Sequence, residues 1–445
     1  MNRTKIMATI GPASWDEKTL EGLILAGVSS CRLNFSHTTA EQAERIIASI
    51  RRICRRLNRP MAIRQDLQGP KIRIGELRQE SYELPSGHEI VFTRRTLEGD
   101  ARKATIAQPE FIEALQPGAV VVIGDNDIKL EVVDKPEPDE VRCRVVIPGT
   151  LRPRKGASAP GTVIRFKGLT PKDIKDFEFC LEQRIDCVSM SFVQTADDIN
   201  LLRAIMDKKG YHIPVISKIE QQNALEHLDA IIANSDGISI ARGDLAVERP
   251  VEELHLLVKE IIRRCHHAGK FVFAGSGILS SLKHAAWPTR AEVGDVASLV
   301  LDGVDAISFS DETAVGDDPV GSVRILSDII ARCERAMFKN RAAAPDPSDL
   351  FRNITPQFPT TWGDRPIVMA ADRYESAARI AKMHYAAPVV AAVRDPSLAN
   401  YLAHYWGLYP IYCPAELSGD ALLAHAENEA RSTGVIGRDD ETIRL

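Results

Sequence analysis

The sequence predicts an α/β protein: a (β/α)8 TIM barrel with an inserted all-β lid domain and a small C-terminal α/β parallel-sheet domain. Three observations predict this class. Short apolar segments alternate with segments of helical period, as in parallel β/α units. One stretch in the first half of the chain changes to short strands and turns. The 445 residues exceed one ordinary core, but fit a barrel of about 250 residues with smaller units.

Eight segments have the length and apolar content of buried parallel strands: 4–10, 29–36, 61–67, 186–192, 213–220, 237–243, 271–276 and 306–311. Amphipathic segments lie between them, such as 250–269, which ends in His-His-Ala-Gly, a plausible helix stop. Eight strand–helix units are the number that closes a barrel. We assign residues 1–75 and 165–340 to the barrel.

The even spacing of strands and helices breaks once, at residues 76–164. Within this stretch, segments 82–95, 118–133 and 140–151 have the alternation and the Gly, Pro and Asp turns of short strands. We therefore expect a small inserted β-barrel. An insertion after a barrel strand stands over the mouth, the end formed by the carboxyl ends of the strands, so it would act as a water-excluding lid.

A second, smaller α/β region follows a stretch rich in Pro, Asp and polar residues. We interpret 341–365 as a linker and 366–445 as a C-terminal domain. Its predicted strands are 366–371, 388–393 and 409–413, with helices around 374–385 and 396–406. The tail beyond residue 420 is charged and has too weak a pattern to predict an element.

The net charge of −5 gives no reason to expect nucleic acid or a membrane surface as the main partner. No run of about 20 apolar residues occurs, and the N-terminus lacks a signal-peptide pattern. Eight scattered cysteines form neither a CxxC pair nor a zinc spacing, which indicates buried thiols in a reducing compartment. We expect a cytoplasmic protein.

Polar and charged residues collect where the predicted strands end. They are Arg32, Asn34, Ser36, Asp66, Arg73, Lys218, Glu220, Asp244, Ser276, Ser310 and Glu312. In a barrel all of them converge on one mouth. Burying such charges unpaired would cost several kcal/mol each, on the order of the penalties known for buried ions. A ligand that carries negative charge and a metal would account for the set.

Two motifs are chemically specific. Lys218 and Glu220 share one face of a strand, although a plain cross-strand ion pair would use the same spacing. Gly243 and Asp244 enter a helix, where free amides bind anions; the alternative is that Asp244 serves as a simple N-cap. Glu220 and Asp244 together would suit Mg²⁺, completed by substrate and water, while Lys218 and Arg32 neutralise a phosphoryl group.

In this order the motifs resemble the pyruvate kinase family. The resemblance rests on segments 4–14, 32–37, 69–75, 216–220, 236–248, 288–292 and 301–314, and extends more weakly over 392–413. It covers nearly the whole barrel and matches the insertion to the family's lid. It implies Mg²⁺-dependent phosphoryl transfer in glycolysis, from phosphoenolpyruvate to ADP, giving pyruvate and ATP. Mn²⁺ could replace Mg²⁺.

The resemblance also implies roles for single residues. The catalytic set would be Lys218, Arg32, Arg73 and Ser276. Substrate would bind at Gly243, Asp244, Ser276 and Lys218. Nucleotide would bind at Arg73, Lys172 and Asn34. The metal ligands would be Glu220 and Asp244. A monovalent-cation pocket would comprise Asn34, Ser36, Asp66 and Leu67.

Lys71 departs from the pattern of the potassium-dependent members, which have a glutamate at this position. With Leu67 and Gln68 it matches the potassium-independent branch of the family. A lysine ammonium beside Asp66 could take the place of a monovalent ion and keep the charge balance. We therefore expect that K⁺ is not required.

Three further departures bear on the substrate. Where the family has a catalytic threonine followed by Gln and Glu, this chain has Ser276, Gly277 and Ser280. The smaller residues leave open a kinase of the same fold that acts on a different carboxylic acid. A catalytically silent ligand-binding homologue is a third possibility, which the retained Lys218 and Glu220 disfavour.

The C-terminal domain does not keep the family's sugar-bisphosphate loop: residues 370–377 read AADRYESA, so we expect no such activation. Segment 288–303 matches a stretch near the family's subunit interface, which implies a homo-tetramer or, with a shortened C-terminal domain, a homo-dimer.

Overall fold

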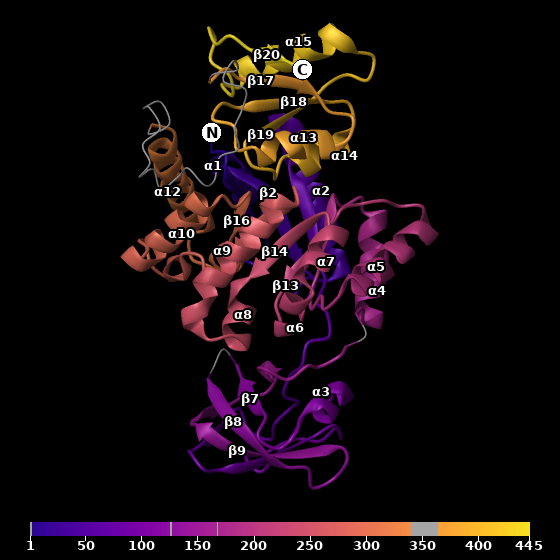
Figure 1. Cartoon of the computed structure of the whole chain (residues 1–445), viewed down its shortest axis with the longest axis vertical. Helices are drawn as coiled ribbons and strands as arrows, with labels where there is room; N and C mark the ends of the chain where they lie inside the picture. Colours follow the sequence, from indigo (N-terminus) through magenta and orange to yellow (C-terminus); the bar gives the residue numbers. More distant parts are fainter. Residues whose placement is uncertain (1, 125–126, 167, 340–363) are drawn as a thin grey trace.

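The computed structural model describes residues 2–124, 127–166, 168–339 and 364–445. Figure 1 shows three bodies along the long axis, with the closed barrel in the middle. The barrel order is β1-β16-β15-β14-β13-β12-β3-β2, and every pairing is parallel, as predicted. Its strands are β1 (Lys5–Thr9), β2 (Val28–Asn34), β3 (Ala62–Asp66), β12 (Cys187–Met190), β13 (Val215–Ile219), β14 (Gly237–Ala241), β15 (Phe271–Gly275) and β16 (Ala306–Ser308).

Several helices around the barrel begin at capping motifs that can be recognised in the sequence. Capping boxes open α2, α4 and α10 at Thr39, Thr170 and Thr289. Their apolar faces pack on the outer faces of the strands and form the main hydrophobic core. The elements are α1 (Glu17–Ala26), α2 (Ala40–Leu57), α4 (Pro171–Glu182), α5 (Ala196–Lys209), α6 (Gln222–Glu226), α7 (Leu228–Asn234), α8 (Arg242–Glu248), α9 (Val251–His267), the 3₁₀ turn η1 (Ser280–Lys283), α10 (Arg290–Asp302), α11 (Asp311–Ala314) and α12 (Pro319–Lys339).

The insertion lies beyond the barrel mouth and has its own apolar core. Its described strands form a six-stranded sheet, β11-β7-β8-β9-β5-β6, and a two-stranded sheet, β10-β4, instead of the closed β-barrel that we expected. A short helix, α3, also interrupts the strands, since Pro109 and Glu110 favour a helix start. The elements are β4 (Tyr82–Leu84), β5 (Glu89–Thr93), β6 (Lys103–Thr105), α3 (Pro109–Ala114), β7 (Val120–Ile123), β8 (Ile128–Asp134), β9 (Glu140–Ile147), β10 (Gly149–Leu151) and β11 (Ala157–Ser158).

The C-terminal domain is a four-stranded parallel sheet in the order β19-β18-β17-β20. Its elements are β17 (Ile367–Ala370), α13 (Tyr374–Lys382), β18 (Val389–Val393), α14 (Pro396–Leu402), β19 (Leu408–Tyr412), α15 (Gly419–Ser432) and β20 (Ile443–Arg444). Our expectation of no element beyond residue 420 is wrong. The buried face of α15 is made by Leu422, Leu423, Ala426 and Ala430, and small alanines give a weak apolar pattern. Most of the expected linker, 341–365, lies outside the described residues.

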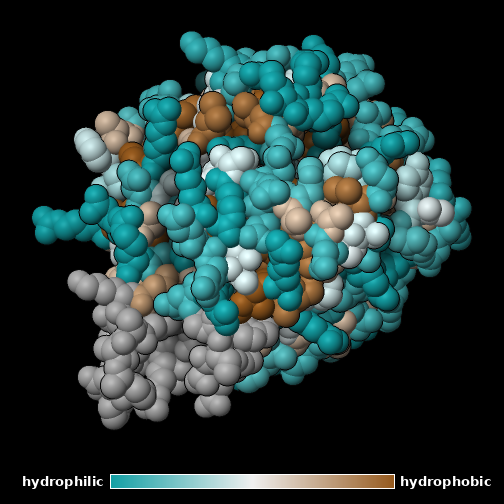
Figure 2. Space-filling model, turned by 90° about the horizontal axis from the view of Figure 1, so that it is seen from above, coloured by the Kyte–Doolittle hydropathy of each residue, from teal (hydrophilic) through white to brown (hydrophobic). Residues whose placement is uncertain are grey.

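This domain covers the barrel floor, the end at which Lys5, Val215 and Phe271 begin their strands. Phe271 and Phe273 from the barrel interior share one apolar cluster with residues of the sheet and of α14. Figure 2 looks down on this end of the molecule, whose surface is mostly hydrophilic, with hydrophobic residues showing mainly in recesses. The domain therefore closes the barrel at its floor.

Two expectations drawn from composition can be compared with the structure. All eight cysteines are free, and seven of them are buried. Across the described ranges, no helix has the length and apolar character needed to cross a membrane.

Candidate active site

Most of the residues predicted at the strand ends meet at the barrel mouth, because all eight strands run in the same direction. Arg32 lies on β2, and Asp66 is the last residue of β3. Lys218 lies on β13, and Glu220 follows that strand directly. These four residues come from three separate parts of the sequence, and the closed sheet brings them into one cluster.

The cluster is a continuous chain of ion pairs. Arg32 Nε donates to Asp66 Oδ2 at 2.5 Å, and Lys218 Nζ lies 3.4 Å from Asp66 Oδ1. The same ammonium lies 2.7 Å from Glu220 Oε1 and donates to Ser191 Oγ at 2.8 Å. Lys218 is thus held between two carboxylates, and the ion pair with Glu220, which the sequence left open as an alternative, is present.

The ion pairs set the protonation of the cluster. Burial raises the pKa of Asp66, but Arg32 and Lys218, with Arg64, outweigh burial and hold this pKa well below its usual range. Burial lowers the pKa of Lys218, but Asp66 and Glu220 outweigh it and raise this pKa above its ordinary value. At neutral pH the cluster therefore contains a carboxylate and an ammonium whose charges are fixed.

Glu220 and Asp244 fit the donor set for a divalent cation. Burial raises the pKa of Glu220, and repulsion from Asp244 adds to this effect against the opposing Lys218. A bound cation would relieve this repulsion, and carboxylate oxygens are ligands that Mg²⁺ prefers. Among the described residues, no group of three or more His, Cys, Asp or Glu side chains could hold a metal ion. Two protein ligands would have to be completed by oxygens of substrate and water.

The start of α8 differs in detail from the prediction. The helix begins at Arg242, so Gly243 and Asp244 lie within its first turn, exposed at the mouth. Its N-cap residue is Ala241, which removes the interpretation of Asp244 as an N-cap. Gly243 lies against the loop after β15: a Cβ added to it would come within 3.2 Å of the Ser276 Cβ.

Ser276 stands at a strained point of the backbone. Its φ is +65°, a left-handed conformation that non-glycine residues seldom adopt, and Gly277 follows with φ +70°. The guanidinium of Arg242 fixes this loop, because Nη2 donates to the Ser276 carbonyl at 2.9 Å while Nη1 pairs with Asp295 at 2.7 Å. The structure therefore holds the Ser276 hydroxyl beside the first turn of α8.

The remaining predicted residues lie around the edge of the cluster. Arg73 donates through Nη1 to the Arg154 carbonyl of the insertion at 2.7 Å, so it joins lid and barrel. Lys172, near the start of α4, pairs with Asp176 and donates to the Phe35 carbonyl at 2.8 Å.

Asn34 Oδ1 accepts from the Ser36 amide at 3.1 Å. Leu67 is buried beside Asp66, and its carbonyl accepts from Ser191 Oγ at 2.7 Å. Asn34 is the residue that pairs with Asp66 in the barrel sheet, and Leu67 follows Asp66 directly. The monovalent-cation pocket stays a prediction.

Lys71 does not pair directly with Asp66. In the described part of the chain no hydrogen bond from its ammonium and no ion pair within 4.0 Å is present; Asp66 is paired with Arg32 and Lys218 instead. Burial lowers the pKa of Lys71, as do the cations of Lys218 and Arg73, while Asp66 opposes them. Lys71 thus acts on Asp66 as a nearby charge.

Sequence reasoning missed three supporting residues. Ser191 accepts from Lys218, Thr9 Oγ1 accepts from Arg32 at 3.1 Å, and Arg242 fixes the Ser276 loop. Ser191 and Thr9 follow the alternation of their strands and end on the interior face, so a systematic reading of period two could have found them. No local signal connects Arg242 with a loop 34 residues away.

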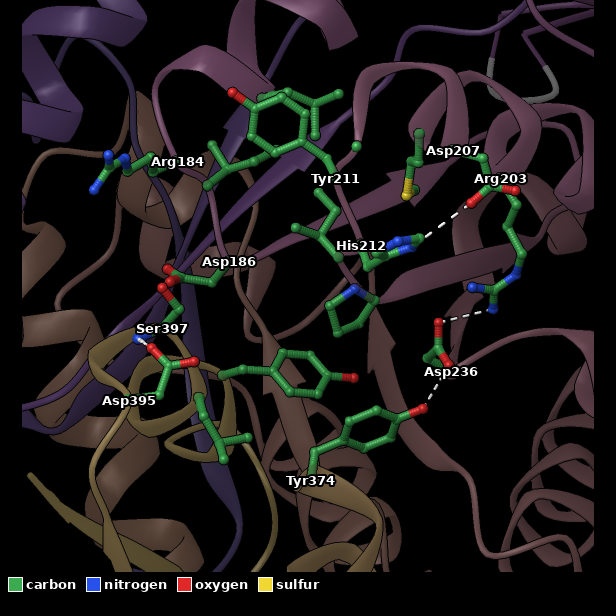
Figure 3. A pocket seen from close by; sticks show the side chains of 18 residues that line it. Arg184, Asp186, Arg203, Asp207, Tyr211, His212, Asp236, Tyr374, Asp395 and Ser397 are labelled. Atoms are coloured by element: carbon green, nitrogen blue, oxygen red, sulfur yellow. Dashed lines mark hydrogen bonds and ion pairs between the residues drawn. The ribbon is translucent and has the colours of Figure 1, made fainter. Parts of the chain in front are cut away.

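A separate cavity of about 630 Å³ lies far from this cluster, between barrel floor and C-terminal domain (Figure 3). It is lined by Asp186 and Asp236 from the barrel and by Tyr374, Asp395 and Ser397 from the C-terminal domain, and Tyr374 points toward Asp236. None of the predicted catalytic residues lines this cavity, so it does not belong to the candidate active site.

Comparison with known proteins agrees with this geometry. Residues 1–323 match the family model "Pyruvate kinase, barrel domain", and residues 363–445 match "Pyruvate kinase, alpha/beta domain". The chain belongs to the pyruvate kinase family. A relative named pyruvate kinase 2, from Synechocystis sp., is 35% identical over 416 residues, which cover 92% of this chain and 70% of the relative.

Two further relatives extend the match. A pyruvate kinase from Staphylococcus aureus is 32% identical over 459 residues, covering all of this chain and 77% of the relative. The crystal structure of a pyruvate kinase from Cryptosporidium parvum superposes with a TM-score of 0.90 at 29% identity, covering all of this chain and 94% of that one. Like its family, the chain is a phosphotransferase with pyruvate kinase function, and the family generally uses Mg²⁺.

Proposed function

We propose that the cluster at the mouth transfers a phosphoryl group from phosphoenolpyruvate to ADP, and that Lys218 is its central catalytic residue. The supporting observation is the position of Lys218: its ammonium is held between Asp66 and Glu220, with Arg32 on the far side of Asp66. In the reaction the bond between phosphorus and the enol oxygen breaks, and phosphorus bonds to a terminal oxygen of ADP. Bound Mg²⁺ would supply further positive charge for the transferring group.

The fixed cations perform the electrostatic part of the reaction. Negative charge spreads over the phosphoryl oxygens in transit, and preorganised cations stabilise it without reorganising. Lys218 and Arg32 are held by carboxylates whose own positions are fixed by strands, so their charges need no rearrangement. Glu220 and Asp244 would hold the divalent ion, for which Mn²⁺ could substitute.

The second half-step is protonation of the enolate carbon. When the phosphoryl group leaves, the enolate must accept one proton at carbon to become pyruvate. We assign this proton to the Ser276 hydroxyl, replenished from solvent, since Ser276 lies beside Gly243, the residue before Asp244. The amides of these two residues would contact the substrate carboxylate.

The nucleotide would lie toward the insertion. We assign Arg73, Lys172 and Asn34 to its binding, supported by the location of Arg73 where barrel and insertion meet. Movement of the insertion would then carry Arg73 with it and couple closure to nucleotide binding.

We propose further that K⁺ is dispensable, because Lys71 supplies charge near Asp66. We also propose a homo-tetramer or homo-dimer in the cytoplasm, without nucleic-acid or membrane partners. Three large apolar side chains support the assembly, since Val251, Leu256 and Trp287 are 71%, 69% and 78% exposed around α9 and the segment before α10. Native mass measurement in solution tests the oligomeric state.

We retain the division into a barrel (1–75 and 165–340), a lid (76–164) and a C-terminal domain (366–445).

One observation favours a second candidate, a kinase of the same fold that acts on a bulkier acid. A Cβ added to Gly277 would meet nothing within 4 Å, so space is open beside Ser276. A larger substituent on the substrate could occupy it. A silent ligand-binding homologue is the weaker alternative, because simple binding does not need an ammonium fixed between two carboxylates.

A coupled assay with purified protein, phosphoenolpyruvate, ADP and Mg²⁺ tests the proposal. Rapid pyruvate formation that is lost in Lys218→Met supports it. Binding of phosphoenolpyruvate without turnover overturns it, and turnover of a bulkier phosphoenol acid in the same assay would favour the second candidate.

A further inference from the structure

One buried cation lies inside the barrel and has no part in the function described so far. Arg64 is on β3, two residues before Asp66, so both side chains point into the barrel interior. Only 1% of its surface is exposed, and it is among the largest fully buried side chains of the described residues. A guanidinium in such a place needs a physical reason.

The contacts of Arg64 direct its charge toward the mouth. Nη1 donates to Ser189 Oγ at 2.7 Å, and Ser189 is the residue that pairs with Asp66 in the barrel sheet. The Arg64 side chain therefore extends along the barrel axis toward the mouth, and its guanidinium lies near the layer of residues that contains Asp66. The Ser189 carbonyl also accepts from the Leu67 amide at 3.0 Å, so the same residue fixes the end of β3.

Aromatic rings separate Arg64 from solvent on the side of the barrel floor. Its guanidinium lies 4.5 Å from the centre of the Phe273 ring, which comes from the opposite side of the barrel. Phe273 packs on Phe271, and Phe271 packs at 4.3 Å on His404, a C-terminal-domain residue whose pKa is lowered by burial and then by Arg64. Solvent therefore screens the charge of Arg64 only weakly, and this charge raises the electrostatic potential at the cluster at the mouth.

A purely structural role explains Arg64 poorly. Its Nε is buried and has no hydrogen-bond partner among the described residues, and no acid pairs with it within 4.0 Å there. A buried donor left unpaired destabilises the folded state. Replacing buried ionic groups by apolar side chains of similar volume is often neutral or stabilising. A methionine would fill the same space without this cost.

We propose that Arg64 is a positioning residue for phosphoryl transfer, which holds Asp66 from beneath in the orientation in which its two oxygens bind Arg32 and Lys218. Asp66 Oδ2 accepts a hydrogen bond from Arg32, whereas Asp66 Oδ1 lies 3.4 Å from the Lys218 ammonium as an ion pair without a hydrogen bond. Rotation of the carboxylate would therefore disturb both contacts. The Arg64 guanidinium, held by Ser189, places a fixed positive charge on the floor side of Asp66. This inference rests on the function proposed above.

Steady-state kinetics and thermal unfolding of Arg64→Met, Arg64→Lys and the unsubstituted chain test the inference. We expect Arg64→Met to lower kcat about 10- to 100-fold, the size typical of lost support behind a catalytic group, while KM for ADP stays unchanged. Its Tm should stay the same or rise. Arg64→Lys should recover a large part of the lost kcat, because it restores the charge.

Lys5→Met provides a matched control. Lys5 is another buried barrel cation, but it faces the C-terminal domain, donates to the Leu408 carbonyl at 2.7 Å and lies over the Tyr409 ring. Its replacement should change Tm and leave kcat unchanged. Ser189→Ala keeps the Arg64 charge and removes its hydrogen bond, so kcat should fall less than in Arg64→Met; this variant decides the question if Arg64→Met does not fold.

An Arg64→Met enzyme with parental kcat would overturn the inference, whatever its Tm. If Arg64→Met does not fold, a Ser189→Ala variant with parental kcat would overturn it. Failure of the proposed function is seen separately, as absence of turnover in the unsubstituted chain. Calorimetric binding of phosphoenolpyruvate with Mg²⁺ then replaces kcat, and equal affinity in Arg64→Met and parent would overturn the inference.

Discussion

The two ends of the barrel use the same residue types for opposite purposes. At the floor, Asp186, Asp236 and Asp305 each precede a strand and accept the amide of the neighbouring strand, from Ile63, Val215 and Val272 respectively. Each also has its own cation: Arg51, Arg203 and Lys382. At the mouth, Asp66 pairs with two cations, Lys218 pairs with two acids, and the charge of Asp244 repels that of Glu220.

The comparison shows how a cluster differs from a set of pairs. At the floor each charge is satisfied locally, so substitution there should affect stability. At the mouth the groups depend on one another and on a ligand for balance, and Ser276 adds backbone strain. Substitution there should affect turnover. The following predictions test this separation, from the largest expected effect to the smallest.

Asp305→Ala should give the largest effect, on stability. Asp305 is fully buried and pairs with Lys382, which is buried as well. Removing one partner leaves the other charged and unpaired, which should cost about 3–5 kcal/mol of unfolding free energy. Urea unfolding measures this loss, and kcat of the folded fraction should be unchanged. A kcat that falls in parallel would remove the distinction between the two ends.

Lys218→Met should give the largest effect on turnover. Loss of one preorganised charge at a transition state should lower kcat about 10²- to 10³-fold. The coupled assay measures it, with circular dichroism as the control for folding. Lys218→Arg should recover little, because a guanidinium does not fit between Asp66 and Glu220 as a compact ammonium does. Near-parental activity of Lys218→Met would disprove its central role.

Ser276→Ala should lower kcat at least about 10²-fold through loss of the proton donor, with little change in KM for phosphoenolpyruvate. Solvent-isotope exchange into pyruvate distinguishes slow protonation from slow phosphoryl transfer. Ser276→Thr is the matched variant, since it retains the hydroxyl, and it should stay active. If the alanine variant protonates the enolate at the parental rate, another group donates the proton.

His266 should make the floor sensitive to acid. Burial, with the Lys382 charge, lowers its pKa from 6.5 to about 4, and the ring bonds the Gly303 carbonyl at 2.8 Å. Between pH 6.5 and 4 the unfolded chain binds a proton that the folded chain does not. Stability is therefore full above about pH 6.5 and falls on the order of 1–3 kcal/mol toward pH 4. His266→Gln should flatten this slope in unfolding titrations; an unaltered slope would assign it elsewhere.

The smallest effect should come from potassium. In a buffer with tetramethylammonium as the only added monovalent cation, KCl should change kcat less than about twofold, since Lys71 already supplies a charge near Asp66. Lys71→Glu should become dependent on KCl. A strong response of the unsubstituted enzyme would contradict the role given to Lys71.

The sequence predicted the barrel and the mouth because both follow local rules. The eight strands stand out by apolar content, and parallel closure alone brings Arg32, Asp66, Lys218 and Glu220 together. What it could not predict depends on distant packing. The short tail elements were hidden by the alanines of α15. The partners of Asp66 are Arg32 and Lys218 and not Lys71, because side-chain reach across the barrel has no local signature.

The floor pairs could have been found. Segments 185–189, 235–239 and 304–308 each read apolar or small residue, Asp, small residue, apolar, Ser, and each Asp binds the preceding strand. This repeated pattern marks structural acids. The acids at the mouth lack this pattern. Its presence in the sequence could therefore distinguish structural acids at the floor from functional acids at the mouth.

The packing of α14 under the strands means that the barrel has no base of its own. Phe271 and Phe273 contact side chains contributed from beyond residue 366. A chain that ended before the C-terminal domain would expose the apolar, aromatic interior of the barrel floor next to Arg64 to solvent. The last eighty residues therefore complete the hydrophobic core of the barrel. Removing or exchanging this domain should destabilise the barrel itself.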